Sequence, residues 1–273
     1  MRALSSDSSF EPIAFLHKDL DVCDSSSCSK ITGLKPDVVV NTAAFHKTDA
    51  CEDDPLRAFQ VNAVGSYNVS RVCNVVGAVH VYISTDYVFS GDKNAPYTEE
   101  DDPDPINVYG VSKLAGEGLA STYAPRHYIV RSSSLFGQAG ASGKGGNFVE
   151  TMIRKASNNE EIKVVDDVRM SPTNTSDLAE GIGKVVKGRL PYGVYHIVNA
   201  GSCSWWEFAR EIVSMAGFDA PVIPTNSALY PTKAKRPQMS ALSSTRLANY
   251  RISLRPWKDA LRGYLQVKGH LRR

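Results

Sequence analysis

Three side chains in the first half of the sequence have types and spacings suited to one reaction. Thr85 ends an apolar, β-branched run that begins at Val79, and Tyr109 and Lys113 follow, four residues apart. The run predicts a buried strand. A helix from Val108 to Leu119 places Tyr109 and Lys113 one turn apart on one face. Because ligands bind at the carboxyl ends of strands in open parallel sheets, the three side chains are expected to converge on one reacting group.

A hydroxyl, a phenol and an ammonium suit hydride transfer to a ketone. Tyr109 would give its proton to the developing alkoxide, and Thr85 would donate a hydrogen bond to the carbonyl oxygen. A phenol has an ordinary pKa of about 10, and the charge of Lys113 would lower that pKa toward the operating range. No side chain supplies a hydride, so a nicotinamide cofactor is implied.

The surrounding sequence predicts the elements that position these groups. Strands are expected in four apolar runs, at residues 13–16, 36–41, 79–85 and 127–131. Helices are expected from Pro55 to Gly77 and from Val108 to about Tyr123. This alternation predicts an α/β fold with a doubly wound parallel, Rossmann-type sheet. We expect a dinucleotide-binding domain at residues 1–145, to which residues 165–200 return, and a smaller C-terminal substrate-binding lobe at residues 146–273.

One joint pattern is restrictive: a strand that ends in Ser84 to Phe89 (STDYVF), followed by Tyr109-x-x-x-Lys113. It resembles the extended short-chain dehydrogenase/reductase superfamily and, within it, the dTDP-4-dehydrorhamnose reductase family. The similarity extends over nearly the whole chain and includes Arg236-Pro237. It implies reduction of the C4 ketone of dTDP-4-dehydro-6-deoxy-L-mannose to dTDP-L-rhamnose, a precursor of cell-surface polysaccharide, with NADPH as the expected cofactor and NADH as the other candidate.

The resemblance also implies roles for individual residues. The catalytic residues would be Thr85, Tyr109 and Lys113. The cofactor would contact His17, Lys18, Asp21, Val22, Ala43, Ala44, Tyr109 and Lys113. The nucleotide-sugar would contact Asp86, Tyr87, Asn147, Phe148 and Arg236. Leu16 stands where an acidic residue would bind the ribose 2′-hydroxyl of NAD. The basic groups after it suit the 2′-phosphate of NADPH, and a solvated turn is the alternative that stays open.

The expected phosphate-binding turn does not occur in the sequence. A dinucleotide-binding sheet opens with a strand and a glycine-rich turn, whose amides and following helix hold the pyrophosphate. Here the first glycine is Gly33, and residues 1–4 resemble the helix that follows such a turn. We favour a natural chain that begins upstream of Met1 over a natural cofactor-poor variant.

The composition gives no support to a nucleic-acid-binding, membrane-spanning or zinc-binding protein. The chain has 273 residues and a net charge of +2, which gives no reason to expect nucleic acid or an anionic membrane as a partner. No apolar run approaches the roughly 20 residues that span a bilayer. The five cysteines are scattered without zinc-site spacing, so we expect no metal, and free thiols in the cytoplasm. The sequence leaves the oligomeric state open, with a homodimer as the candidate.

Two alternatives stay open. A reductase or epimerase of another nucleotide-sugar would carry the same three catalytic residues, and Ser134 stands where the family often has a tryptophan beside the sugar. A non-catalytic subunit, similar to the regulatory subunit of methionine adenosyltransferase, fits the missing glycine turn but has no need of all three catalytic residues. The pair Trp205 and Trp206 suits sugar stacking or packing, and we favour packing.

Overall fold

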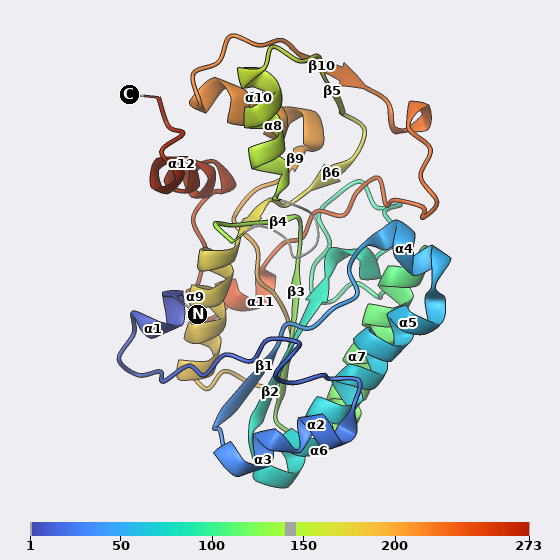
Figure 1. Ribbon diagram of the computed structural model, residues 1–273, viewed down its shortest axis with the longest axis vertical. Coiled ribbons are helices and arrows are strands. Elements are labelled where there is room, and N and C mark those ends of the chain that lie inside the picture. Colours follow the sequence, from blue (N-terminus) through green and yellow to red (C-terminus); the bar gives the residue numbers. More distant parts are fainter. Residues whose placement is uncertain (1, 140–145, 273) are drawn as a thin grey trace.

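A parallel sheet covered by helices on both faces forms the centre of the computed structural model, which describes residues 2–139 and 146–272 (Figure 1). In these residues the main sheet has four strands, in the order β1 (Val38–Asn41), β2 (Val79–Thr85), β3 (His127–Ser132) and β8 (Gly193–His196). Each neighbouring pair is parallel. The predicted fold, a doubly wound Rossmann-type sheet, is confirmed.

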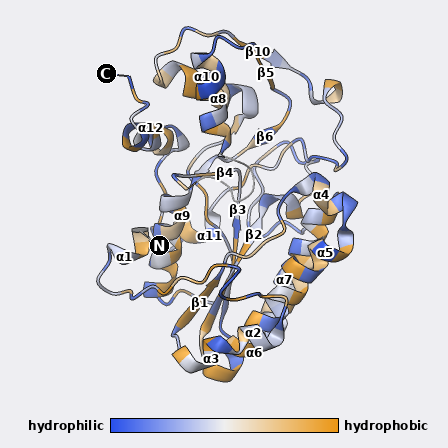
Figure 2. Ribbon diagram, in the orientation of Figure 1, coloured by the Kyte–Doolittle hydropathy of each residue, from blue (hydrophilic) through white to orange (hydrophobic). Residues whose placement is uncertain are grey.

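Helices pack against both faces of this sheet, and its strands accordingly carry many buried apolar and aromatic residues (Figure 2). On one face lie α6 (Gly65–Val76) and α7 (Val108–Tyr123), and on the other lie α9 (Thr175–Lys187) and α11 (Thr245–Ala248) (Figure 1). The second face is held by one cluster of buried side chains: Val81, Tyr128, Val130, Leu178, Ile182, Val185, Tyr195, Ile197 and Leu247.

The helical segment before β2 begins and ends where the sequence predicted. Pro55 stands in the first turn of α5 (Pro55–Phe59), and Gly77 ends α6 with a left-handed φ of 71°. Between α5 and α6 the chain forms a π-helix, Gln60–Val64, which the sequence did not predict. The short helix α4 (Thr48–Asp53) precedes them.

The predicted strand at residues 13–16 is wrong. The carbonyl of Leu16 accepts hydrogen bonds from the amides of Asp19 and Leu20, so the chain turns where the strand should end. Ile13 is 63% exposed and Leu16 is 62% exposed. A strand needs a neighbour to pair with. In the described part of the chain β1 pairs with β2 at one edge and with no strand at the other.

The other N-terminal elements are short helices. The first, α1 (Arg2–Ser5), lies beside α9 (Figure 1), and Leu4 faces Gly183 there. The next two, α2 (Ser25–Cys28) and α3 (Lys30–Leu34), pack near α6. Residues 2–5 are therefore helical, as predicted for the start of the chain.

A second lobe lies beyond the carboxyl ends of the central strands (Figure 1). Its strands pair as β5 (Ile162–Val165) with β10 (Val222–Thr225), β6 (Arg169–Met170) with β9 (Cys203–Ser204), and β4 (Leu135–Phe136) with β7 (Thr173–Asn174). Its helices are α8 (Phe148–Ser157), α10 (Trp205–Met215) and α12 (Trp257–Lys268). One-turn 3₁₀ helices occur at η2 (Asp86–Val88) and η3 (Ser227–Leu229).

Aromatic side chains hold this lobe together. The ring of Trp205 lies 4.7 Å from that of Phe148, and the indole N–H of Trp206 donates to the Val222 carbonyl at 2.8 Å. Both tryptophans therefore serve packing, which supports the interpretation that we favoured. Within the described residues, no helix combines the length and apolarity needed to cross a membrane.

Candidate active site

Thr85 lies at the carboxyl end of β2, where the parallel sheet predicts a ligand site. Its hydroxyl donates to Oδ1 of Asp86 at 3.0 Å and accepts from the amide of Tyr87 at 3.2 Å. A threonine hydroxyl has a single proton. The hydrogen bond that we expected from Thr85 to a substrate carbonyl would need that proton, and in the free chain Asp86 takes it.

Helix α7 brings Tyr109 to Thr85. The helix begins after Asn107, whose side chain accepts from the amide of Gly110 at 2.8 Å. A Cβ at Gly110 would lie 2.1 Å from the carbonyl oxygen of Tyr87, so only glycine lets the helix approach the turn after β2 this closely. The Tyr109 hydroxyl lies close to that of Thr85, and the Tyr109 ring meets that of Tyr87 edge to face at 6.0 Å.

The electrostatics of this pair differ from the sequence-based expectation. Burial raises the pKa of Tyr109 above that of an ordinary phenol, the hydrogen bond with Thr85 opposes the rise, and the Asp86 carboxylate adds to it. The amine of Lys113 donates to the Ile83 carbonyl at 2.6 Å. Burial lowers the pKa of Lys113 to about 7 and the nearby Glu117 opposes this. Lys113 is thus one turn from Tyr109, as predicted, but no lowering of the Tyr109 pKa by its charge is seen.

The lowered pKa of Lys113 predicts how stability depends on pH. Between the folded pKa of about 7 and the ordinary value of 10.5, the unfolded chain binds more protons at this site, so stability rises with pH. Lys113→Met should remove this contribution, whose slope is at most about 1.4 kcal/mol per pH unit. Urea unfolding at several pH values in this window measures the slope. Lys184→Met, at an exposed position of α9, is the control, and equal slopes in the two variants would contradict the prediction.

Two buried polar groups that support the site were not predicted. Asn62, in the π-helix, accepts from the Phe45 amide at 2.8 Å and donates to the Ser112 hydroxyl at 2.9 Å. It thereby ties the loop after β1 to α7. Its one signal in the sequence is a polar residue inside an apolar run, Val61-Asn62-Ala63-Val64, and π-helical turns often mark functional sites.

The second group is a buried ion pair that joins α7 to the sheet. Arg131 donates to Glu117 through Nε at 3.0 Å and through a terminal nitrogen at 2.7 Å, and both side chains are 5% exposed. The Ser84 hydroxyl donates to the same carboxylate at 2.5 Å. Because Glu117 stands one turn after Lys113, this pair fixes the helix face that carries Tyr109 and Lys113.

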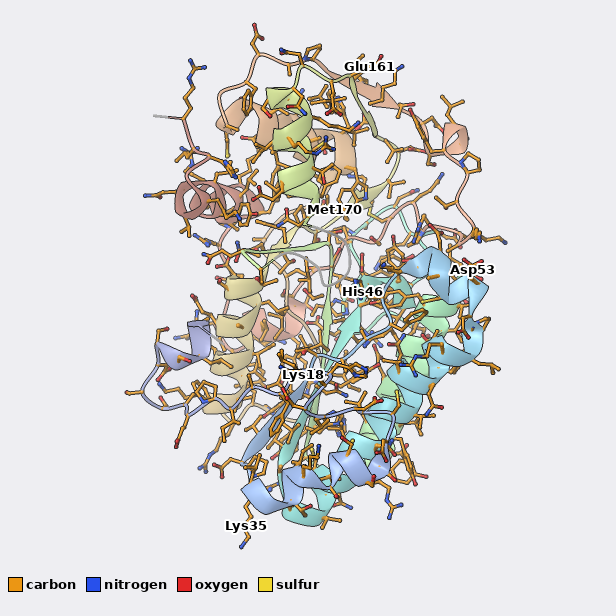
Figure 3. All side chains as sticks on the ribbon, in the orientation of Figure 1. Lys18, Lys35, His46, Asp53, Glu161 and Met170 are labelled. Atoms are coloured by element: carbon orange, nitrogen blue, oxygen red, sulfur yellow. The ribbon has the colours of Figure 1, made fainter. Side chains whose placement is uncertain are left out.

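The residues assigned to the adenosine half of the cofactor come from the segment before α2 and from the loop after β1. The Val22 carbonyl accepts from Asn68 of α6 at 2.9 Å, and Val22 shares an apolar cluster with Ala43. His17 is exposed, with Nδ1 3.9 Å from the Asp21 carboxylate. Figure 3 shows Lys18 on the exposed segment that crosses in front of the central strands. Ala44, the residue after Ala43, is half-buried.

The residues assigned to the nucleotide-sugar divide into two groups: Arg236 lies near Tyr87, and Asn147 and Phe148 lie in the second lobe. Arg236 reaches the site: its guanidinium lies 6.0 Å from the centre of the Tyr87 ring and donates to the Asp49 carboxylate at 3.0 Å. Asn147 caps α8 and donates to the Tyr264 hydroxyl at 3.0 Å, and the Phe148 ring stacks 5.8 Å from Phe208.

Asp86 is 4% exposed and lies beneath the site rather than at its surface. Residues 138–146 are rich in glycine, alanine and serine, which predicts a loop, and residues 140–145 of this stretch lie outside the described residues. Among the residues that the structure describes, no cluster of three metal-ligating side chains occurs.

Comparison with known proteins gives the family. The family model described as "RmlD substrate binding domain" matches residues 1–269. The spore coat polysaccharide biosynthesis protein SpsK of Bacillus subtilis is 39% identical over 95% of this chain and 89% of its own length. The dTDP-4-dehydrorhamnose reductase of Mycolicibacterium smegmatis is 38% identical over 91% of this chain and 76% of its own length. The structure of dTDP-4-dehydrorhamnose reductase from Bacillus anthracis in complex with NADP is 36% identical, with a TM-score of 0.90 over 97% of this chain and 93% of that one. The chain therefore belongs to the RmlD substrate binding domain family, the family of the dTDP-4-dehydrorhamnose reductases that it matches.

Proposed function

We propose that this chain catalyses the NADPH-dependent reduction of the C4 ketone of dTDP-4-dehydro-6-deoxy-L-mannose to dTDP-L-rhamnose. The observation that carries the proposal is the convergence of Thr85 and Tyr109 at the carboxyl end of the central sheet, one helical turn from the buried amine of Lys113. The relatives named dTDP-4-dehydrorhamnose reductase, which match most of the chain, support the substrate.

The nicotinamide end of NADPH fits the residues present. An ammonium has three protons, and the Ile83 carbonyl takes one from Lys113, so this group can donate to ribose hydroxyls as well. When bound, the cofactor supplies the hydride. No glycine-rich turn precedes β1 in the residues that the structure describes, so we assign no residue to the pyrophosphate. His17 and Lys18 are proposed to face the 2′-phosphate, with Asp21, Val22, Ala43 and Ala44 beside the adenosine.

Tyr109 performs the proton transfer. As the C4 carbonyl is reduced, its oxygen gains the electron pair of the C=O double bond and takes the proton from the Tyr109 hydroxyl. A C–H and an O–H bond form, and the phenolate then recovers a proton from solvent. A raised pKa keeps Tyr109 protonated until an alkoxide develops. Lys113 remains beside the phenol and holds the ribose.

Arg236 is proposed to bind the diphosphate of the nucleotide-sugar, because a planar guanidinium matches phosphate oxygens. Arg236→Ala should raise KM for the nucleotide-sugar roughly tenfold or more, the loss of one charge-assisted contact of about 1.5–3 kcal/mol, with little change in KM for NADPH. Steady-state kinetics with each substrate varied measures both. Lys163→Ala, at an exposed lysine of the second lobe, is the control. Equal effects on both KM values would contradict the assignment.

The proposed substrate is tested by offering a panel of ketones to the purified chain. We expect NADPH oxidation, followed at 340 nm, with the dTDP-linked 4-keto sugar and much slower oxidation with UDP- or GDP-linked analogues. Preference for another nucleotide-sugar would select the first alternative. Absence of turnover together with a change in methionine adenosyltransferase activity would select the regulatory alternative and overturn the proposal.

Two further proposals concern the setting of the enzyme. Its five cysteines are free thiols, which suits the reducing cytoplasm, where we place the reaction.

Large side chains exposed on the outer faces of α5, α6 and α7 support a homodimer: Leu56, Val75, Val111 and Tyr123. Analytical ultracentrifugation tests the dimer, and the mass of a single chain at micromolar concentration would contradict it.

A further inference from the structure

The carboxylates of α4 have no role in the chemistry described so far, and one of them holds a segment of the second lobe. Residues 231–237, called the strap below, follow η3, reach α4 and carry Arg236 (Figure 1). Asp49 of α4 accepts from the Ala234 amide through Oδ1 at 3.1 Å and from the Arg236 guanidinium through Oδ2 at 3.0 Å. One carboxylate thus holds both the backbone of the strap and the side chain proposed to bind the diphosphate.

The strap is also tied to the start of the helix that carries Tyr109. Asn107, which caps α7 and is 5% exposed, donates through its side-chain amide to the Lys235 carbonyl at 2.9 Å. The amide of Val108 in turn donates to Glu52 of α4 at 2.9 Å. The helix α4, the strap and the first turn of α7 therefore form a closed set of contacts, which sets how far the guanidinium of the strap lies from the phenol of α7.

The hydrogen bond to Asp49 leaves most of the Arg236 guanidinium available to a ligand. A guanidinium has five N–H groups in a planar fork, and this bond uses one of them. The Arg236 side chain is 28% exposed, and its central guanidinium carbon lies 6.0 Å from the centre of the Tyr87 ring. A carboxylate on one side and an aromatic ring on another orient this long side chain before any anion binds.

We propose that Asp49 is a positioning residue for the nucleotide-sugar: it orients Arg236 in advance, so that the guanidinium meets the diphosphate without first losing its own rotamer freedom. Asp49 acts through Arg236 and not on the diphosphate itself, because two anions repel each other. This role rests on the proposed function, in which Arg236 binds the nucleotide-sugar. The Asp49 side chain is 44% exposed, and exposed ion pairs add little to stability, so the effect is expected in binding and not in folding.

Asp49→Asn tests this role, because its amide oxygen can still accept from Ala234 while the charge that faces Arg236 is lost. We expect KM for the dTDP-linked 4-keto sugar to rise roughly 3- to 10-fold, the cost of ordering one long side chain on binding, with kcat and KM for NADPH nearly unchanged. Asp53→Asn is the matched control. Asp53 stands on the same helix and pairs with Lys233 of the strap, but both of these side chains are more than half exposed, so neither KM should change.

A double-mutant cycle separates positioning from a merely structural role. In an Arg236→Ala background the guanidinium is absent, so adding Asp49→Asn should change KM for the nucleotide-sugar by no more than about twofold, the scatter with which mutational effects are measured to add. If Asp49 only supported the fold, its loss would weaken binding equally in both backgrounds. The midpoint of urea unfolding, which should be the same in Asp49→Asn and the wild type, checks the same point.

Calorimetry with dTDP gives a readout that needs no turnover. Its Kd should rise by the same factor of roughly 3 to 10 in Asp49→Asn, and only where Arg236 is present. If the wild type reduces no nucleotide-sugar but dTDP binding responds in this way, the proposed reduction fails and the positioning role stands. An unchanged KM and Kd in Asp49→Asn, or an equal loss in the Arg236→Ala background, would overturn the positioning role. A lower KM would overturn it as well, by showing that Asp49 competes with the diphosphate for Arg236.

Discussion

Tyr109→Phe should reduce kcat for the keto-sugar by about 10²- to 10⁴-fold, the contribution of a positioned general acid. The variant keeps the ring, and with it the edge-to-face contact with Tyr87 at 6.0 Å, and loses the hydroxyl that lies close to Thr85. Binding of NADPH, measured by calorimetry, should change little, because the proposed contact with the ribose is made by Lys113. The expected result is a protein that binds its cofactor and does not reduce the ketone.

Tyr123→Phe is the matched control for this variant. It removes a phenol from the same helix, at an exposed position at its end. We expect wild-type kcat in the control. If Tyr109→Phe kept wild-type kcat, proton donation would have to come from another group, and the assignment of the catalytic acid would be wrong.

Arg131→Met should destabilise the folded chain by about 3–5 kcal/mol, because it leaves the Glu117 carboxylate buried without its partner. That loss is a large share of the 5–15 kcal/mol by which native domains are typically stable, so the midpoint of urea unfolding should fall steeply. The ion pair is 5% exposed on each side, so solvent cannot take over the lost interactions.

Two comparisons test this reading of the ion pair. The exposed pair of Arg154 and Glu160 has a similar separation of 2.9 Å, and Arg154→Met should cost no more than about 1 kcal/mol. The double variant Arg131→Met with Glu117→Leu should recover most of the loss, since no unpaired charge remains. A double variant as unstable as Arg131→Met alone would show that lost packing, and not the isolated carboxylate, causes the destabilisation.

The sequence predicted the parts of this site that depend on local patterns. Thr85 is recognisable because it ends an apolar run, and Tyr109 and Lys113 because helical spacing places them together. The supporting contacts could not be predicted in the same way. Glu117 and Arg131 are 14 residues apart on different elements, and Asp86 meets Ser133 across 47 residues, so only the folded sheet shows that they touch.

The one wrong strand has a related cause. Residues 13–16 are apolar, and local apolarity predicts a strand without showing whether a neighbouring strand is there to pair with it. In the described residues that neighbour is absent. The expected effect of Lys113 on Tyr109 failed for a comparable reason, because spacing along a helix does not show how deeply an amine is buried or which carbonyl it reaches.

Transfer of deuterium from NADPH to the sugar tests the central claim most directly. The purified chain would be incubated with the dTDP-linked 4-keto sugar and NADPH carrying deuterium at nicotinamide C4, and the product analysed by NMR. The account predicts dTDP-L-rhamnose with deuterium at C4 from the wild type, formed about 10²- to 10⁴-fold more slowly by Tyr109→Phe. Unlabelled product, or label at any other sugar carbon, would contradict reduction of the C4 ketone at this site.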